Sequence, residues 1–210
     1  MQSLLGDLLD LARLDAGRER LEIRDFDASV LLRDLCDATR PLAAERGLFL
    51  KAEGPASLPV RSDPTQVYRI AQNLLLNAVR ATETGGVTVS WRPGAEHLSP
   101  RWVLCIEDTG RGLEAARGEP LLQALQDPSQ ESQALPVRES KAAGDTTNVP
   151  SEAAGRDHST GAGEGIGLSI VKRLCELLHA SLELDTGAQR GTTFCLSFPR
   201  EYPQSARNAS

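Results

Sequence analysis

Apolar residues recur along the chain with two different periods. Where they return every three or four positions, they predict amphipathic helices that bury one face. Such segments cover residues 28–46, 64–82 and 165–179. Where apolar residues alternate with polar ones, or form short uninterrupted runs, they predict strands. Strands are expected at residues 21–24, 48–52, 87–91, 102–106, 181–185 and 192–198.

The first two helices begin at recognisable start signals. Asp27 can cap the first helix, and Asp63 can cap the second, where Pro64 and Gln66 complete the signal. Pro41 lies inside the first helix and predicts a kink or break there. The inner faces predicted for the three helices are formed by Val30, Leu31, Leu35, Leu42 and Ala43, by Val67, Ala71, Leu74 and Ala78, and by Leu168, Val171, Leu174, Cys175 and Leu178.

The order of these elements predicts a mixed, mainly antiparallel sheet with helices on one face, an α+β two-layer sandwich. A chain of 210 residues is long enough for one main domain, which we assign to residues 19–202. Within it, residues 113–162 are rich in Gln, Ser, Glu, Pro, Ala and Gly and predict a long mobile lid. Residues 1–18 have the leucine spacing of the end of a longer helix, and residues 203–210 are expected to form a disordered tail.

Composition and charge restrict the classes of partner. The formal net charge is -6 and the pI is about 5.2, which argues against a nucleic-acid groove or an anionic membrane surface. No apolar run approaches the roughly 20 residues of a membrane-spanning helix. A soluble, cytoplasmic protein is therefore expected, and its core should be aliphatic because aromatic residues make up only 4% of the chain.

The four cysteines lie in separate apolar segments and form no C-x-x-C pair. They are Cys36, Cys105, Cys175 and Cys195. This distribution predicts buried free thiols in a reducing compartment.

A polar stripe runs along the second predicted helix. Its residues are spaced three or four positions apart and therefore share one face: Gln66, Arg69, Asn73, Asn77 and Arg80. Asparagine costs a helix interior roughly 0.5 kcal/mol relative to alanine, so two of them in one stripe call for a reason. Taken alone, the stripe fits a solvated face and a cation site equally well. In the second case amide oxygens would coordinate Mg²⁺, which holds phosphate oxygens, and Arg80 would add positive charge.

Two glycine-containing segments also suggest a ligand. "EDTGRG" at residues 107–112 follows a strand, and Asp108 there can accept a hydrogen bond from the amine of adenine, although D-T-G alone is more often an ordinary turn. "GAGEGIGLSIV" at residues 161–171 leads into a helix, whose amino end favours anions. It matches neither the dinucleotide fingerprint nor the P-loop.

Taken together, these segments resemble the ATP-binding domain of sensor histidine kinases and the wider family of gyrase, Hsp90 and MutL ATPases. "QNLLLNAVRAT" at 72–82 resembles the N box of that family, "DTGRG" at 108–112 its first glycine box, "GEGIGLSIVKRL" at 163–174 its second and "GTTF" at 191–194 its third. "LLGDLLDLARLDAG" at 4–17 resembles the end of the second helix of the kinases' dimerisation and phosphoacceptor domain. The resemblance implies the Bergerat-type ATP-binding fold.

The resemblance also implies roles for individual residues. Asp108 would bind the adenine amine, Asn77 would be the principal Mg²⁺ ligand with help from Asn73, and Arg80 stands where the family commonly has lysine. Asn77 and Arg80 would then be the catalytic residues. The other implied nucleotide-binding positions are Gly110, Gly112, Gly163, Gly165, Ile166, Gly167, Leu168 and Thr193.

The function implied is that of a protein-histidine kinase catalytic domain using ATP and Mg²⁺. None of His97, His158 and His179 is followed by an acidic residue, as the phosphoacceptor of the family is, so the acceptor is expected upstream in a longer parent. The implied partners are the parent's phosphoacceptor-helix domain, a response-regulator receiver domain and a second copy through the parent's helical bundle. Two alternatives stay open, an ATPase without a kinase role and a nucleotide-free, pseudokinase-like interaction module.

Overall fold

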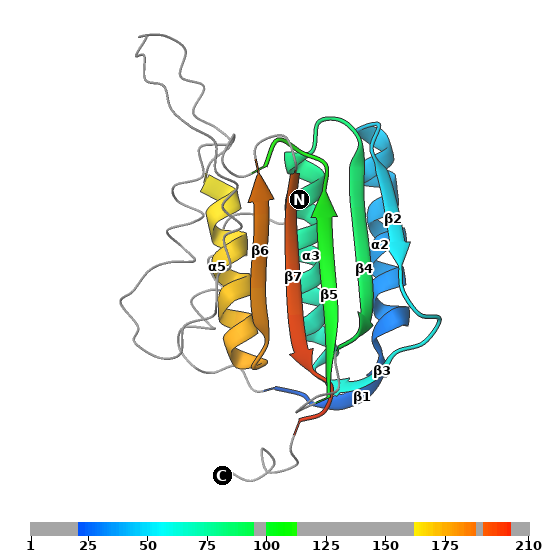
Figure 1. The fold of residues 1–210 in the computed structure, drawn as a ribbon, viewed down its shortest axis with the longest axis vertical. Coiled ribbons are helices and arrows are strands. Elements are labelled where there is room, and N and C mark those ends of the chain that lie inside the picture. The colour runs from blue at the N-terminus through cyan, green and yellow to red at the C-terminus, as the bar shows by residue number, and fades with distance from the viewer. Residues whose placement is uncertain (1–20, 95–99, 113–161, 188–190, 203–210) are drawn as a thin grey trace.

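The computed structural model describes residues 21–94, 100–112, 162–187 and 191–202 and shows two layers (Figure 1). Its strands are β1 (Arg24–Asp27), β2 (Phe49–Glu53), β3 (Pro59–Ser62), β4 (Gly86–Pro93), β5 (Arg101–Asp108), β6 (Ser181–Gly187) and β7 (Gly191–Pro199), and its helices are α2 (Ala28–Glu45), α3 (Pro64–Ala81) and α5 (Ala162–Leu177). A five-stranded sheet has the order β2-β4-β5-β7-β6, and β1 pairs with β3 in a second, smaller sheet.

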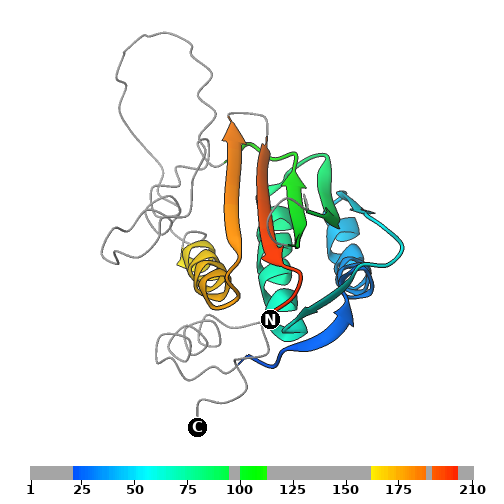
Figure 2. The ribbon, with the colours of Figure 1, turned by 60° about the horizontal axis from the view of Figure 1, so that its bottom comes forward.

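The arrangement confirms the predicted fold class. β2 and β4 run parallel, whereas the other neighbouring strands of the large sheet run antiparallel. The three described helices lie on the same side of this sheet (Figures 1 and 2). The opposite face of the sheet is therefore turned away from them.

The core lies between the large sheet and the helices. Every residue of the inner faces predicted for α3 and α5 is buried. The central strands contribute alternate side chains, namely Val87, Val89, Trp91, Trp102, Leu104, Ile106, Phe194, Leu196 and Phe198. Trp102 and Phe198 stack with their ring centroids 4.6 Å apart, so the core is not purely aliphatic as composition predicted.

The predicted start of α3 is confirmed by its cap. Asp63 accepts hydrogen bonds from the amides of Thr65 at 2.9 Å and Gln66 at 3.2 Å through Oδ1. Its Oδ2 accepts a third bond, 2.8 Å long, from the amide of Glu22. Asp63 therefore both starts the helix and attaches the chain that precedes β1.

The inner face of α2 was predicted only in part, with Leu35 and Ala43 buried as expected. The buried residues are Ala28, Ser29, Leu32, Leu35, Cys36, Thr39 and Ala43. Val30 and Leu42 are instead 52% and 38% exposed. Three consecutive large apolar residues, Val30 to Leu32, lie in the first turns of this helix, so its pattern fits more than one face. The predicted break is also absent, because α2 continues through exposed Pro41 to its end at Glu45.

The small sheet of β1 and β3 was only partly predicted. The strand expected at residues 21–24 starts at its last position, where β1 begins. β3 was not predicted, and it pairs antiparallel with β1, with Phe26 opposite Val60. A four-residue strand that starts with proline gives too little alternation to be recognised.

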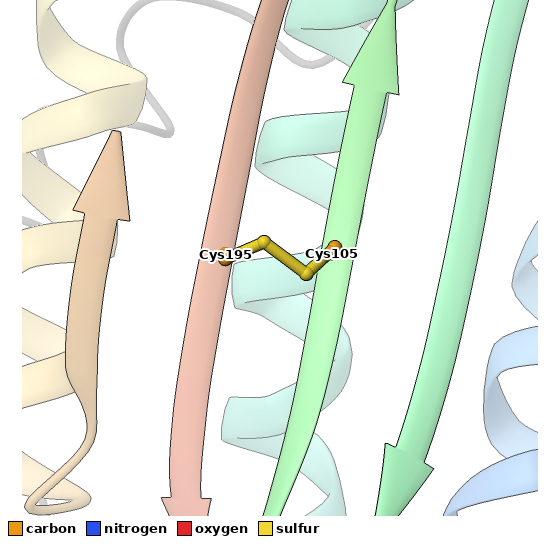
Figure 3. Close-up of a disulfide and its surroundings, with 2 residues drawn as sticks. All are labelled: Cys105 and Cys195. Atoms are coloured by element: carbon orange, nitrogen blue, oxygen red, sulfur yellow. A yellow bond between two sulfur atoms is a disulfide. The ribbon is translucent and has the colours of Figure 1, made fainter. Parts of the chain in front are cut away.

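The prediction of four free thiols is wrong for two of the cysteines. Cys105 of β5 and Cys195 of β7 form a disulfide, with their Cα atoms 4.2 Å apart (Figure 3). Strand alternation places both on the sheet face away from the helices, and the antiparallel register places them directly opposite each other. Cys36 and Cys175 are free and buried, and burial raises their pKa values to about 11 and about 12.

Some predicted segments lie outside the described residues. These are the helix end at residues 1–18, the lid except for its last residue, and the tail at residues 203–210. Within the described ranges, no helix is both long enough and apolar enough to cross a membrane.

Candidate functional site

Asp108 ends β5 in a buried position, where its side chain is held by two other segments. The Asp108 residue is 4% exposed. Oδ1 accepts hydrogen bonds from the amide of Gly110 at 2.8 Å and the amide of Thr192 at 3.3 Å. Burial raises the pKa of the Asp108 carboxyl above its usual range, and the bonds from Gly110 and Thr192 partly oppose that shift. The carboxylate is therefore fixed in place and poorly solvated.

Two glycines allow the backbone to approach this carboxylate closely. At Gly191, where φ is +75°, a Cβ atom would lie 1.9 Å from the backbone oxygen of Asp108. At Gly110, a Cβ atom would lie 2.8 Å from Oδ1 of Asp108 and 3.1 Å from the backbone oxygen of Ala81. β7, the turn after β5 and the end of α3 therefore meet at Asp108.

Thr109 connects the turn after β5 to the start of β4 through hydrogen bonds. Its Oγ1 accepts a hydrogen bond from the amide of Gly86 at 2.9 Å and donates to the backbone oxygen of Thr84 at 3.0 Å. Its own amide donates to the backbone oxygen of Gly86 at 3.1 Å. Gly85 has φ +90°, and a Cβ atom there would lie 2.2 Å from Oγ1 of Thr109. The threonine hydroxyl thus occupies space that only glycine leaves free.

Replacing Thr109 by valine keeps the side-chain shape and removes the hydroxyl. We expect Thr109→Val to lower the free energy of unfolding by about 1–2 kcal/mol, because it removes the hydrogen-bond partner of Gly86 and Thr84. Thr109→Ser should retain most of the stability. Urea unfolding of the three proteins measures the difference, and a valine variant as stable as the unmodified chain would contradict this role of the hydroxyl.

The two asparagines of α3 face α5. A Cβ atom on Gly167 would lie 3.3 Å from Oδ1 of Asn73 and 3.5 Å from Nδ2 of Asn77. The Nδ2 of Asn73 donates to the backbone oxygen of Arg69 at 2.8 Å, which directs its Oδ1 away from the helix backbone. The second glycine segment thus packs directly against the amide-bearing face of α3.

The polar stripe is not a uniformly solvated face. Gln66 is buried, and its Oε1 accepts a hydrogen bond from Arg69 at 3.2 Å. Asn73 and Asn77 are half-buried, whereas Arg80 is exposed. Among these described residues, exposure to solvent is therefore greatest at the carboxyl end of the stripe.

The three segments meet around the carboxyl-terminal half of α3. Gly167 touches Asn73 and Asn77 from one side, and the turn at Gly110 touches Ala81 one helical turn beyond Asn77. Residues that are far apart in the sequence therefore border one region. Among the described residues, no group of three or more His, Cys, Asp or Glu side chains could hold a metal ion, so amide oxygens are the candidate ligands there.

The remaining residues predicted to bind nucleotide lie in different surroundings. Gly163, Gly165 and Ile166 lie within the first turns of α5, which begins three residues earlier than expected. Leu168 is buried in the core. Gly112 has φ +76° and is buried.

Thr193 and its neighbour lie on opposite faces of β7. Thr193 pairs with Glu107 and Asp185 on the sheet face away from the helices. Thr192 is buried on the other face, and its amide and hydroxyl contact the carboxylate of Asp108. The structure therefore brings Thr192, a residue that sequence reasoning missed, to the candidate site in place of Thr193. Counting alternate positions back from buried Phe194 would have identified it.

Comparison of sequences finds one family. The profile described as "Histidine kinase-, DNA gyrase B-, and HSP90-like ATPase" matches residues 62–202. Curated relatives include the autoinducer 2 sensor kinase/phosphatase LuxQ of Vibrio vulnificus strain YJ016, 27% identical over 95% of this chain and 21% of its own. The cell-division control histidine kinase PdhS of Brucella canis is 28% identical over 94% of this chain and 17% of its own. The chain thus spans about a fifth of the length of these relatives.

Solved structures share the fold. Full-length ShkA in complex with AMPPNP superposes with a TM-score of 0.67 at 23% identity and covers 93% of this chain and 35% of its own. The nucleotide-free catalytic domain of the histidine kinase ThkA gives a TM-score of 0.60 at 15% identity, with coverage of 86% and 97%. The second comparison shows that the same architecture occurs as a single catalytic domain.

Proposed function

Because the chain belongs to the family of histidine kinase-, DNA gyrase B- and HSP90-like ATPases, we propose that it is the ATP-binding catalytic domain of a two-component sensor histidine kinase. One observation carries the proposal, the meeting of Asp108, the asparagines of α3 and Gly167 around one region. The named relatives, which are sensor kinases, support the kinase branch of the family over its other members.

The adenine end of the nucleotide is assigned to Asp108. Oδ1 already accepts two amide bonds, so Oδ2 is the oxygen proposed to accept a bond from the adenine amine. Gly110 leaves room beside this carboxylate, because a side chain there would collide with it. Guanine presents a carbonyl oxygen where adenine has its amine, so a carboxylate selects adenine.

The phosphate end is assigned to Asn77, Asn73 and Arg80. Amide oxygens are hard ligands that suit Mg²⁺, which keeps several waters and binds few protein groups beside the phosphates. The bond from Asn73 to the backbone oxygen of Arg69 leaves its Oδ1 available on the side of Gly167. Bound Mg²⁺ would neutralise charge on the phosphate oxygens, and exposed Arg80 would add a guanidinium at the same end of α3.

In the proposed reaction the γ-phosphoryl group passes to a histidine of the parent kinase. The bond between the γ-phosphorus and its bridging oxygen breaks, a bond to a histidine nitrogen forms, and ADP leaves. The residues of this chain hold the nucleotide and stabilise charge, which is the main form of catalysis in phosphoryl transfer. A receiver domain of a response regulator would then take the phosphoryl group. We place the domain in the cytoplasm, where ATP is abundant.

The experiment combines binding with transfer. The chain is titrated with Mg·AMPPNP in a calorimeter and then incubated with γ-labelled Mg·ATP and the isolated phosphoacceptor domain of its parent. Binding followed by labelling of a histidine in that domain is expected. Binding and hydrolysis without labelling would favour an ATPase without a kinase role, and failure to bind would favour an interaction module. Either outcome would overturn the proposed kinase function.

A further inference from the structure

The disulfide lies on the face of the sheet that is turned away from the three described helices. Cys105 and Cys195 are both half-buried, and their neighbours on that face are polar, Ser90 across from Cys105 and Glu183 across from Cys195. A small thiol reagent can therefore reach the sulfur atoms without unfolding of the domain. Cys36 and Cys175 are fully buried, and burial holds their thiols protonated.

The strand pairing does not depend on the disulfide. β5 and β7 are paired along their lengths, from Arg101 opposite Pro199 to Glu107 opposite Thr193. We expect this ladder to stay in place when the sulfur bond opens, and the same register keeps the two cysteines opposite each other for closure. Both redox states are therefore compatible with the same fold.

The disulfide joins the two strands that hold the candidate nucleotide site. Cys105 precedes Asp108 by three residues on β5, and Cys195 follows Thr192 by three residues on β7. The amide of Thr192 is one of the two backbone amides that donate to the Asp108 carboxylate. A bond between the strands at this distance limits separation of their ends. It therefore raises the fraction of molecules in which Asp108 is correctly held.

We propose that Cys105 and Cys195 form a reversible redox-modification site that adjusts the affinity of the domain for nucleotide. The coupling to nucleotide rests on the proposed function. Disulfides of cytoplasmic proteins are usually transient or redox-sensing, which agrees with a regulatory bond in a domain that uses cytoplasmic ATP. The oxidised form holds the ends of β5 and β7 together and binds nucleotide more tightly than the reduced form.

The chemistry is a two-electron exchange. One thiolate of a dithiol attacks the sulfur of one cysteine, which forms a mixed disulfide and releases the other cysteine as a thiol. The second thiol of the dithiol then displaces the first cysteine, so that two protein thiols and one oxidised dithiol result. In the reverse direction, one thiolate attacks hydrogen peroxide to give a sulfenic acid with loss of hydroxide, which becomes water. The second thiol displaces a second water as the disulfide forms.

The first test counts thiols in the folded chain. The oxidised domain should show no thiol that reacts with a chromogenic thiol reagent without denaturant, and after dithiothreitol it should show two. Hydrogen peroxide should return the count to zero. Circular dichroism checks that the fold persists throughout. If the two thiols appear only when the domain unfolds, the site is a structural crosslink and the proposal is overturned.

The second test compares the two redox states in calorimetric titration with Mg·AMPPNP. We expect the reduced state to bind about threefold to tenfold more weakly. The double variant Cys105→Ser/Cys195→Ser should bind like the reduced chain and ignore dithiothreitol, whereas Cys175→Ala should respond to dithiothreitol as the unmodified chain does. Equal affinity of the two states would overturn the coupling. Failure of both states to bind would instead overturn the proposed function, and the thiol count would still decide whether the site is redox-active.

Discussion

Asp108→Asn is expected to weaken binding of Mg·ATP by about a hundredfold or more. The variant keeps an Oδ1 atom that can accept the amide bonds of Gly110 and Thr192. It replaces Oδ2 with an NH₂ group, which would point a donor at the amine donor of adenine. Losing a charge-assisted bond and leaving two donors unpaired accounts for an effect of this size.

The same variant should not be less stable than the unmodified chain at neutral pH. Burial raises the pKa of Asp108 in the folded state, so the folded protein binds this proton more tightly than the unfolded chain does. The contribution of Asp108 to stability is therefore greatest below the unfolded pKa, about 3.9, and decreases as the pH rises through the higher folded value. Asparagine has no charge to desolvate and lacks this pH-dependent loss.

Two measurements check this pair of effects. Calorimetry with Mg·AMPPNP gives the affinity, and urea unfolding at pH 4 and pH 7 gives the stability. The matched control is Glu107→Gln, which changes the adjacent carboxylate on the opposite, exposed side of β5 and should leave affinity unchanged. Nucleotide binding that survives in Asp108→Asn would remove the assignment of the adenine site.

Asn77→Ala is expected to abolish the dependence of nucleotide affinity on magnesium. It should also lower the rate of phosphoryl transfer to the parent's phosphoacceptor domain by about a hundredfold to a thousandfold, because it removes the proposed principal protein ligand of the cation that would neutralise phosphate charge. The fold should persist, since Asn77 is half-buried and alanine is favourable within a helix.

Two neighbouring variants separate this role from general damage to α3. Asn73→Ala should show the same defects to a smaller extent, because part of the Asn73 amide is already bonded to the backbone oxygen of Arg69. Gln72→Ala changes a half-buried amide of the same helix and should keep the full magnesium response. If affinity for nucleotide still rises with magnesium in Asn77→Ala, the cation is held elsewhere.

The parts of the fold that the sequence predicted well are those with strong local signals. α3 begins at a cap, its buried residues recur with helical spacing, and Asp63 forms the bonds expected of it. α2 was predicted as an element, but only part of its buried face was predicted correctly, because the run from Val30 to Leu32 does not select one direction. β3 was not predicted, because four residues are too few to show a clear alternation of apolar and polar positions.

The features that joined distant segments were harder to predict from the residues alone. The disulfide depends on the register between β5 and β7, which tertiary packing sets and which neither strand encodes by itself. The contact of Gly167 with Asn73 and Asn77 likewise depends on how two helices pack. The resemblance of motifs to a known family, rather than periodicity, supplied the expectation that these segments would meet.

Thr192 and Thr193 show how a single position changes what a residue contacts. Motif matching pointed to the third glycine box but did not specify which threonine faces the carboxylate. Because side chains alternate along a strand, a shift of one position moves a residue to the other face of the sheet. Strand phase relative to buried Phe194 is the information that was needed.

The two outer strands of the large sheet carry exposed charges that oppose growth of the sheet by pairing with another molecule. Lys51 and Glu53 lie on β2, and Glu183 and Asp185 lie on β6. Charged side chains at sheet edges disfavour addition of a foreign strand, and with it aggregation. Copies of the domain at high local concentration should therefore stay separate instead of exchanging strands through these edges.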